Sequence, residues 1–150
     1  MATEARLVSS AISDPSDSSD GVSPLVSVII TTHNRCQLVG GAIESALRQS
    51  YQHIEIIVVD DGSTDDTVGI IDGFVARFSN VLSVRHPQAR GGNAARNSGI
   101  RAASGRFVAG LDDDDRFLPD HISDLMAAYE PKYSMVAGRA IERASERDGL

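Results

Sequence analysis

The sequence is short of cysteine, of long apolar runs and of basic residues, and each shortage excludes a class of protein. Cys36 is the only cysteine among the 150 residues, which excludes an internal disulfide framework and fits a reducing compartment. No apolar run approaches the length that spans a bilayer. The N-terminus lacks the basic start and the apolar core of a signal peptide. We therefore expect a cytoplasmic protein without a transmembrane segment.

The net charge and the length of the chain further limit the kinds of protein that it can be. A net charge of −7 argues against a nucleic-acid-binding protein, which would carry a basic patch. A length of 150 residues with 41% apolar content is enough for one domain with a substantial core. The sequence is therefore that of an ordinary globular protein.

The first residues differ from the rest of the chain. Between Ser9 and Pro24 lie seven serines, three aspartates and two prolines, and a segment of this kind has little apolar surface to bury. We predict a disordered tail at residues 1–23 and one folded domain at residues 24–150, with Pro24 at its entry.

Short apolar runs alternate with amphipathic stretches through the rest of the sequence. Strands are predicted at 26–30, 54–59, 81–84 and 107–111, and a further one begins at 135. Helices are predicted at 34–49, after a capping box at 63–66, at 91–104 and from Pro119. This alternation predicts an α/β fold, a mostly parallel sheet with helices on both faces.

Four consecutive aspartates, Asp112 to Asp115, follow one of the predicted strands. Adjacent like charges repel, so folding alone does not favour four carboxylates at one strand end. A divalent cation would relieve the repulsion, and Mg²⁺ and Mn²⁺ bind through one or two carboxylates together with substrate phosphates. The alternative is a solvated acidic turn. A second acidic turn at 60–63, also after an apolar strand, favours the metal.

Polar residues follow three of the predicted strands, at 31–34, 60–63 and 112–115. Ligands of parallel sheets bind beyond the carboxyl ends of the strands, so we expect these segments along one edge of the sheet. The stretch with Arg90, Arg96 and Arg101 is expected nearby. Carboxylates for a metal beside arginines for phosphate suggest a nucleoside diphosphate. A solvated helix face is the alternative for the arginines, and the preferred interpretation of Arg101.

Four blocks of the sequence, at 26–35, 57–65, 91–100 and 111–119, resemble the successive motifs of family 2 glycosyltransferases. The resemblance implies the GT-A fold, which is Rossmann-like, and an inverting, hexosyltransferase-like enzyme. Its donor would be a nucleotide-diphospho-sugar, commonly a UDP-sugar, with Mn²⁺ or Mg²⁺ as cofactor. It also implies an unknown sugar or lipid-linked acceptor in cell-surface polysaccharide synthesis. Peripheral association with a membrane or with other glycosyltransferase subunits stays open.

The resemblance also implies roles for individual residues. Thr31 and Asp61 would hold the nucleobase, and His33 would lie against it. Arg96 would stand near the phosphates. The nucleotide-sugar site would further include the first two residues of the DXD triplet, Asp112 and Asp113, with Asp113 facing the ribose or diphosphate. The last residue of the triplet, Asp114, would bind the metal.

The sequence departs from the family pattern in two ways. Proline and tyrosine are common in the family at the positions of Thr31 and His33. Family members also carry a later acidic residue that serves as general base, and we identify no catalytic residue in this sequence, so the base is expected beyond residue 150. The chain has the residues for the leaving group and lacks those for the acceptor.

Two other functions remain as alternatives. A non-catalytic fragment that binds a nucleotide sugar would need only the residues named above. A phosphorelay receiver domain also carries an acidic pair and a phospho-accepting aspartate at strand ends. A receiver needs a lysine after a late strand, however, and the only lysine, Lys132, precedes one. The strand from Val26 would also be surplus in a receiver, so we disfavour this alternative.

Overall fold

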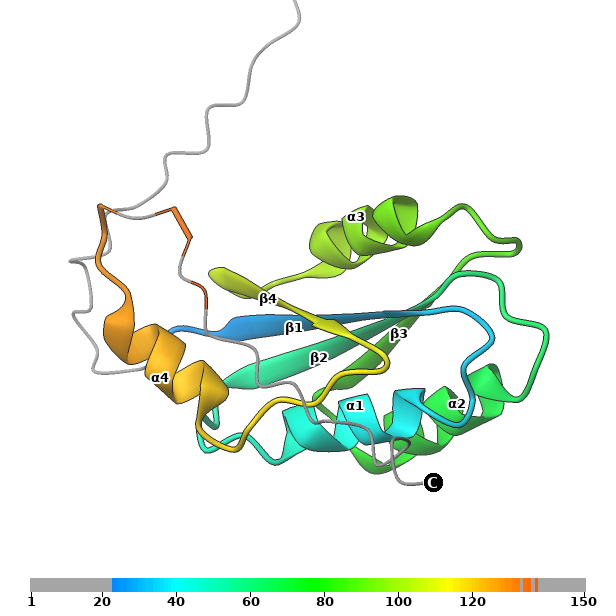
Figure 1. Ribbon diagram of the computed structural model, residues 1–150, viewed down its shortest axis with the longest axis horizontal. Coiled ribbons are helices and arrows are strands. Elements are labelled where there is room, and N and C mark those ends of the chain that lie inside the picture. Colours follow the sequence, from blue (N-terminus) through cyan, green and yellow to red (C-terminus); the bar gives the residue numbers. More distant parts are fainter. Residues whose placement is uncertain (1–22, 133, 136, 138–150) are drawn as a thin grey trace, which may run out of the picture.

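The computed structural model describes residues 23–132, 134, 135 and 137, and in this range strands and helices alternate strictly (Figure 1). The elements are β1 (Val26–Thr32), α1 (Val39–Leu47), β2 (Ile54–Asp60), α2 (Thr67–Arg77), β3 (Val81–Arg85), α3 (Gly92–Ala102), β4 (Phe107–Asp112) and α4 (His121–Ala128). The predicted α/β alternation is confirmed for these elements. No helix of the described residues combines the length and the apolar character needed to cross a membrane.

The strands form one sheet in the order β3-β2-β1-β4, and every pairing in it is parallel. Thr32 at the end of β1 is in register with Asp60 at the end of β2, and Thr31 is in register with Asp112 at the end of β4. The carboxyl ends of these three strands therefore lie level with one another. The polar segments that follow them are brought to one edge of the sheet.

The core covers both faces of the sheet, because successive residues of a strand point to opposite sides. Figure 1 shows α3 on one face and α1 and α2 on the other. The larger cluster includes Val28, Ile30, Ile56 and Val58 of the strands with Val39, Ile43, Ile71 and Ile122 of the helices. The smaller cluster holds Ile29, Ile57 and Val59 against Ala95 of α3. The α3 face therefore has much less apolar contact than the opposite face.

The first helix begins at Val39, five residues later than predicted. Asn34 has a φ of 52°, and the Leu38 amide donates to the Arg35 carbonyl over 3.0 Å in a turn. The amides of Arg35 and Cys36 donate to Thr67 Oγ1 and Asp65 Oδ2, over 3.0 and 3.1 Å. Bonds to the loop after β2 and to the first residue of α2 thus hold this segment as a turn, which sequence periodicity could not reveal.

The capping box predicted at 63–66 is wrong. The Ser63 hydroxyl accepts a hydrogen bond from the Asn34 amide over 2.8 Å instead. Asp66 is the N-cap of α2 but makes no side-chain capping bond. The Asp65 carboxylate accepts from the Thr67 amide over 3.0 Å and satisfies one of the first donors of the helix.

The remaining helices differ from the predictions only at their ends. Helix α3 runs from Gly92 to Ala102, one residue inside its predicted start and two inside its predicted end. Helix α4 begins at His121 rather than at Pro119. Residues 1–22 of the predicted tail lie outside the described residues. So does most of the strand predicted from 135, where Met135 and Ala137 are described and are not in a strand.

Candidate functional site

The loops after β1 and β2 are joined to each other by hydrogen bonds at the carboxyl edge of the sheet. The Asp61 amide donates to the Thr32 carbonyl over 2.9 Å, and the Thr64 amide donates to Asn34 Oδ1 over 2.7 Å. His33 Nδ1 lies 2.8 Å from the Asp61 carbonyl and donates to it, while Asn34 Nδ2 lies 3.1 Å from His33 Nε2. The imidazole of His33 is therefore fixed in orientation, yet it is exposed at the edge.

The aspartate run after β4 is held by a guanidinium group from the loop after β1. Arg35 Nη1 donates to Asp114 Oδ2 over 2.7 Å and lies 3.6 Å from Asp113 Oδ1. The hydrogen bond to Asp114, followed by the charge of Asp113, raises the pKa of Arg35. The Asp113 side chain is only 10% exposed, whereas that of Asp114 is 52% exposed. Two of the carboxylates thus attract a cation at this point.

These carboxylates fit a metal that shares its ligands with a substrate. Within the described residues no group of three or more His, Cys, Asp or Glu side chains could hold a metal ion. Mg²⁺ and Mn²⁺ usually keep waters and bind through one or two carboxylates plus substrate phosphates. Asp113 and Asp114 lie side by side with the Arg35 cation on them, so their chemistry suits such a partial site.

A second arginine reaches the aspartate run from α3. Arg96 Nη2 donates to Asp112 Oδ1 over 3.3 Å, and both side chains are about half exposed. Arg101 instead donates to Ser98 Oγ on its own helix over 3.0 Å. Arg90 contributes its backbone amide, which bonds to Asp61. Of the three predicted arginines, only Arg96 directs its guanidinium to the aspartates in a bond that the structure shows.

Asp61 is buried, 4% exposed, and its carboxylate holds the loop at 86–91. Oδ1 accepts from His86 Nδ1 over 2.6 Å and from the Arg90 amide over 2.9 Å, and Oδ2 accepts from the Gly91 amide over 2.7 Å. Burial by itself would raise the pKa of Asp61, but these hydrogen bonds outweigh it and the pKa is lowered. The Arg90 amide also lies 3.0 Å from Oδ2, so each oxygen of this carboxylate already accepts two contacts.

Sequence reasoning missed two residues that the structure places at this edge. Arg35 was expected only as part of a helix start, and no sequence pattern singled out His86, yet His86 is 7% exposed and bonded to Asp61. A signal for Arg35 existed, because it lies in the loop directly after β1. For His86 the signal was its position directly after β3, at the same edge of the sheet.

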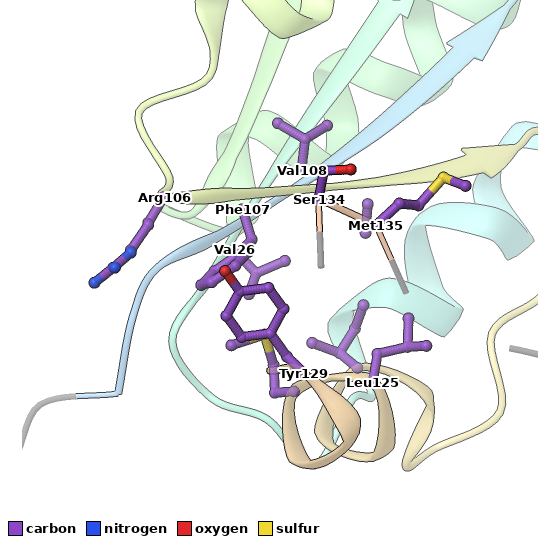
Figure 2. Close-up of a pocket in the computed structure, with 11 residues that line it drawn as sticks. Val26, Arg106, Phe107, Val108, Leu125, Tyr129, Ser134 and Met135 are labelled. Atoms are coloured by element: carbon purple, nitrogen blue, oxygen red, sulfur yellow. The ribbon is translucent and has the colours of Figure 1, made fainter. Parts of the chain in front are cut away.

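An apolar hollow of about 300 Å³ lies elsewhere, between β4 and α4 (Figure 2). Its lining includes Phe107, Leu125, Met126 and Tyr129. It adjoins the first half of β4, whereas Asp112 ends that strand. The hollow is thus separate from the polar edge and offers no charged group that could bind a diphosphate, apart from Arg106.

In a parallel α/β sheet, ligands bind beyond the carboxyl ends of the strands, where this chain gathers its arginines and aspartates. The model of the family described as "Glycosyl transferase family 2" matches residues 27–149. The chain belongs to this family.

Curated relatives agree with this assignment. A UDP-Glc:alpha-D-GlcNAc-diphosphoundecaprenol beta-1,3-glucosyltransferase, WfaP of Escherichia coli, is 40% identical over 100 residues, covering 67% of this chain and 39% of that protein. A GalNAc(5)-diNAcBac-PP-undecaprenol beta-1,3-glucosyltransferase of Campylobacter jejuni is 38% identical over 121 residues, 79% of this chain and 38% of that protein. The chain spans about two fifths of the length of these relatives.

Solved structures show the same fold, GT-A. TarS of S. aureus in complex with UDP has a TM-score of 0.63 and 30% identity, with 68% of this chain and 31% of that chain covered. The mannosyltransferase PcManGT of Pyrobaculum calidifontis, in complex with GDP-Man and Mn²⁺, has a TM-score of 0.61 and 28% identity, with 67% and 30% covered. The predicted family and fold are both confirmed.

Proposed function

We propose that this chain binds the nucleoside diphosphate of a sugar donor, a UDP-sugar, at the carboxyl edge of β1, β2 and β4. The proposal rests on one observation: at this edge, Arg35 and Arg96 form ion pairs with the aspartates Asp112 to Asp114. Guanidinium groups match phosphate oxygens, and the carboxylates attract a divalent cation. The UDP complex of the similar TarS structure supports the choice of nucleotide.

Each predicted site residue has a role in this proposal. Thr31, His33 and Asp61 face the nucleobase, with the Asp61 carboxylate as acceptor. Asp112 and Asp113 face the nucleotide sugar, Asp113 at the ribose or diphosphate. Arg96 lies near the phosphates. Asp114 would hold Mn²⁺ or Mg²⁺. The bound ion would neutralise the negative charge that develops on the departing diphosphate.

We further propose that the reaction of the family member is inverting hexosyl transfer. Such a transfer needs a base to take a proton from the acceptor hydroxyl. The acidic residues at the edge are assigned to the donor, so none of them is proposed as this base. We infer that residues 24–150 form the donor-binding part of a GT-A transferase, and that the 150-residue chain alone binds a donor but transfers sugar slowly or not at all.

The acceptor is proposed from the relatives. The names of both curated relatives contain an undecaprenol-linked diphosphate saccharide. We propose a lipid-linked sugar acceptor and a role in cell-surface polysaccharide synthesis, with the protein at the membrane surface or beside other transferase subunits.

The test is calorimetric titration of the chain with UDP, with Mn²⁺ and after chelation. We expect measurable binding with metal and much weaker binding without it. Asp114→Asn should remove most of the gain that the metal gives, whereas Asp115→Asn, one residue further along the same run, should retain it. Equal affinity with and without metal would show that the DXD assignment is wrong.

A further inference from the structure

His86 is the centre of a series of hydrogen bonds that joins the loop after β2 to α3, and this series is buried at Asp61 and partly buried at Ser98. Its Nδ1 lies 2.6 Å from Asp61 Oδ1, and its Nε2 lies 2.9 Å from Ser98 Oγ. The His86 amide donates to the Asp60 carbonyl over 2.9 Å, which fixes the backbone directly after β3. Both ring nitrogens are therefore used, each by a different element of the fold.

One end of this series fixes the direction of its first bond. The Asp61 carboxylate can only accept, so His86 Nδ1 donates to Asp61 Oδ1. His86 Nε2 is hydrogen-bonded to Ser98 Oγ, which accepts from Arg101 Nη2 over 3.0 Å. The series therefore runs Arg101, Ser98, His86, Asp61.

The position of α3 depends strongly on polar contacts of this kind. Its apolar contact with the sheet rests on one small cluster, and its N-cap, Gly91, has no side chain to bond the helix. At the far end, the Ser104 amide and hydroxyl bond to Glu55 over 2.7 and 2.8 Å. In the middle of the helix, the His86–Ser98 bond ties α3 to the segment after β3, and the longer, exposed Arg96–Asp112 bond ties it to β4.

We propose that His86 is a positioning residue for the nucleotide site, which sets Asp61 and Arg96 at a fixed separation so that both address one ligand. The inference rests on the proposed function. Arg96 lies two residues before Ser98 on α3, so a shift of the helix away from His86 carries the guanidinium away from Asp112. Loss of His86 also releases one of the three donors that orient the Asp61 carboxylate.

The experiment is calorimetric titration with UDP and Mn²⁺ of the unaltered chain and six variants. Four are single substitutions described next, and the others are Arg96→Gln and the double variant of Arg96→Gln with Ser98→Ala. His86→Leu removes both bonds, and His86→Asn keeps an amide donor for Asp61 but is too short to reach Ser98. Ser98→Ala removes the bond between His86 and α3, together with the exposed bond within the helix that Arg101 donates to Ser98. The matched control is Ser104→Ala, which removes a hydrogen bond of similar length just beyond the C-terminal end of the same helix.

One hydrogen bond contributes about 1 kcal/mol, so each single-bond variant should weaken UDP binding about fivefold, and His86→Leu more than tenfold. Ser104→Ala should stay within about twofold while its melting temperature falls. In the double variant of Ser98→Ala with Arg96→Gln, the factor by which UDP binding weakens should be smaller than the product of the factors for the two single variants. Both substitutions act on the same contact, the one between Arg96 and the ligand.

The outcomes separate the two proposals. If the unaltered chain fails to bind UDP, the proposed function is wrong and the role of His86 with it. If the unaltered chain binds UDP and His86→Asn and Ser98→Ala bind it equally well, only the positioning role is overturned. Equal losses for Ser104→Ala and Ser98→Ala would also overturn it, because the effect would then be general destabilisation of α3. Should His86→Leu not fold, the other variants still decide.

Discussion

Arg35 and Asp114 are joined by a hydrogen bond of 2.7 Å between guanidinium and carboxylate, although they are 79 residues apart in the sequence. Both side chains are about half exposed. Exposed ion pairs are weak because water and salt screen them, so this pair can exchange for another partner. Asp114 is also the residue proposed to bind a divalent cation. On that proposal, the Arg35 guanidinium would compete with the metal for Asp114 in the absence of nucleotide.

Removal of this competitor should strengthen metal binding. In Arg35→Gln without nucleotide, we expect Mn²⁺ to bind about two- to fivefold more tightly, the range that corresponds to one exposed ion pair. Titration followed by the electron paramagnetic resonance of free Mn²⁺ measures this affinity. Arg48→Gln is the control, because Arg48 also pairs with a carboxylate, that of Glu44, but on α1. Unchanged or weaker Mn²⁺ binding in Arg35→Gln would contradict the competition.

Asp61 holds the loop at 86–91, and its removal should cost stability as well as nucleotide affinity. In Asp61→Ala the donors on His86, Arg90 and Gly91 lose their acceptor. An unsatisfied buried polar group costs about 1–3 kcal/mol, so we expect the free energy of unfolding to fall by at least this amount. Urea denaturation measures it. Asp115→Ala should change it by no more than about 0.5 kcal/mol, as is usual at exposed positions. Equal stability of the two variants would show that the loop does not depend on Asp61.

The strands and their common edge could be predicted from the sequence because both depend on local patterns. The apolar run at 54–59 lies within β2, and the polar residues after it lie at the carboxyl edge. The contacts within the edge could not be predicted in the same way. His86 and Asp61 are 25 residues apart in the sequence. No repeating pattern of residues in the sequence indicates that two such polar groups are buried and bonded to each other. The late start of α1 has the same cause, because bonds from a distant loop compete with the helix.

The pKa of Asp65 gives the chain a defined response to acid. The hydrogen bond from the Thr67 hydroxyl is the largest cause that lowers this pKa, from 3.8 to about 2. A carboxylate whose pKa is lowered by folding stabilises the fold above its unfolded pKa, and this contribution is lost as the pH falls through the folded value. We therefore expect the free energy of unfolding to decline between pH 4 and pH 2. In Asp65→Asn the decline, measured by urea denaturation across this range, should be shallower. An unchanged slope would mean that Asp65 does not titrate differently in the folded state.

The last prediction concerns the close approach of α3 to the sheet. A Cβ at Gly99 would lie 2.4 Å from Ile29 Cγ2 and 3.1 Å from Val59 Cγ2, and these atoms belong to buried side chains. Overpacking of a core typically costs about 1–3 kcal/mol, so Gly99→Ala should lower the free energy of unfolding by about this amount. It should also weaken UDP binding, because Arg96 is on the displaced helix.

Gly73 of α2 supplies the matched control, because nothing lies within 4 Å of a Cβ at that position. Alanine is the better helix former by about 1 kcal/mol in an exposed helix interior. Gly73→Ala should therefore raise the free energy of unfolding and leave UDP binding unchanged. The same substitution is thus expected to stabilise the chain in α2 and to destabilise it in α3. Urea denaturation and calorimetry of both variants measure the two effects. If Gly99→Ala stabilised the chain as Gly73→Ala does, α3 would have room to move off the sheet, and its packing there would not fix the position of Arg96.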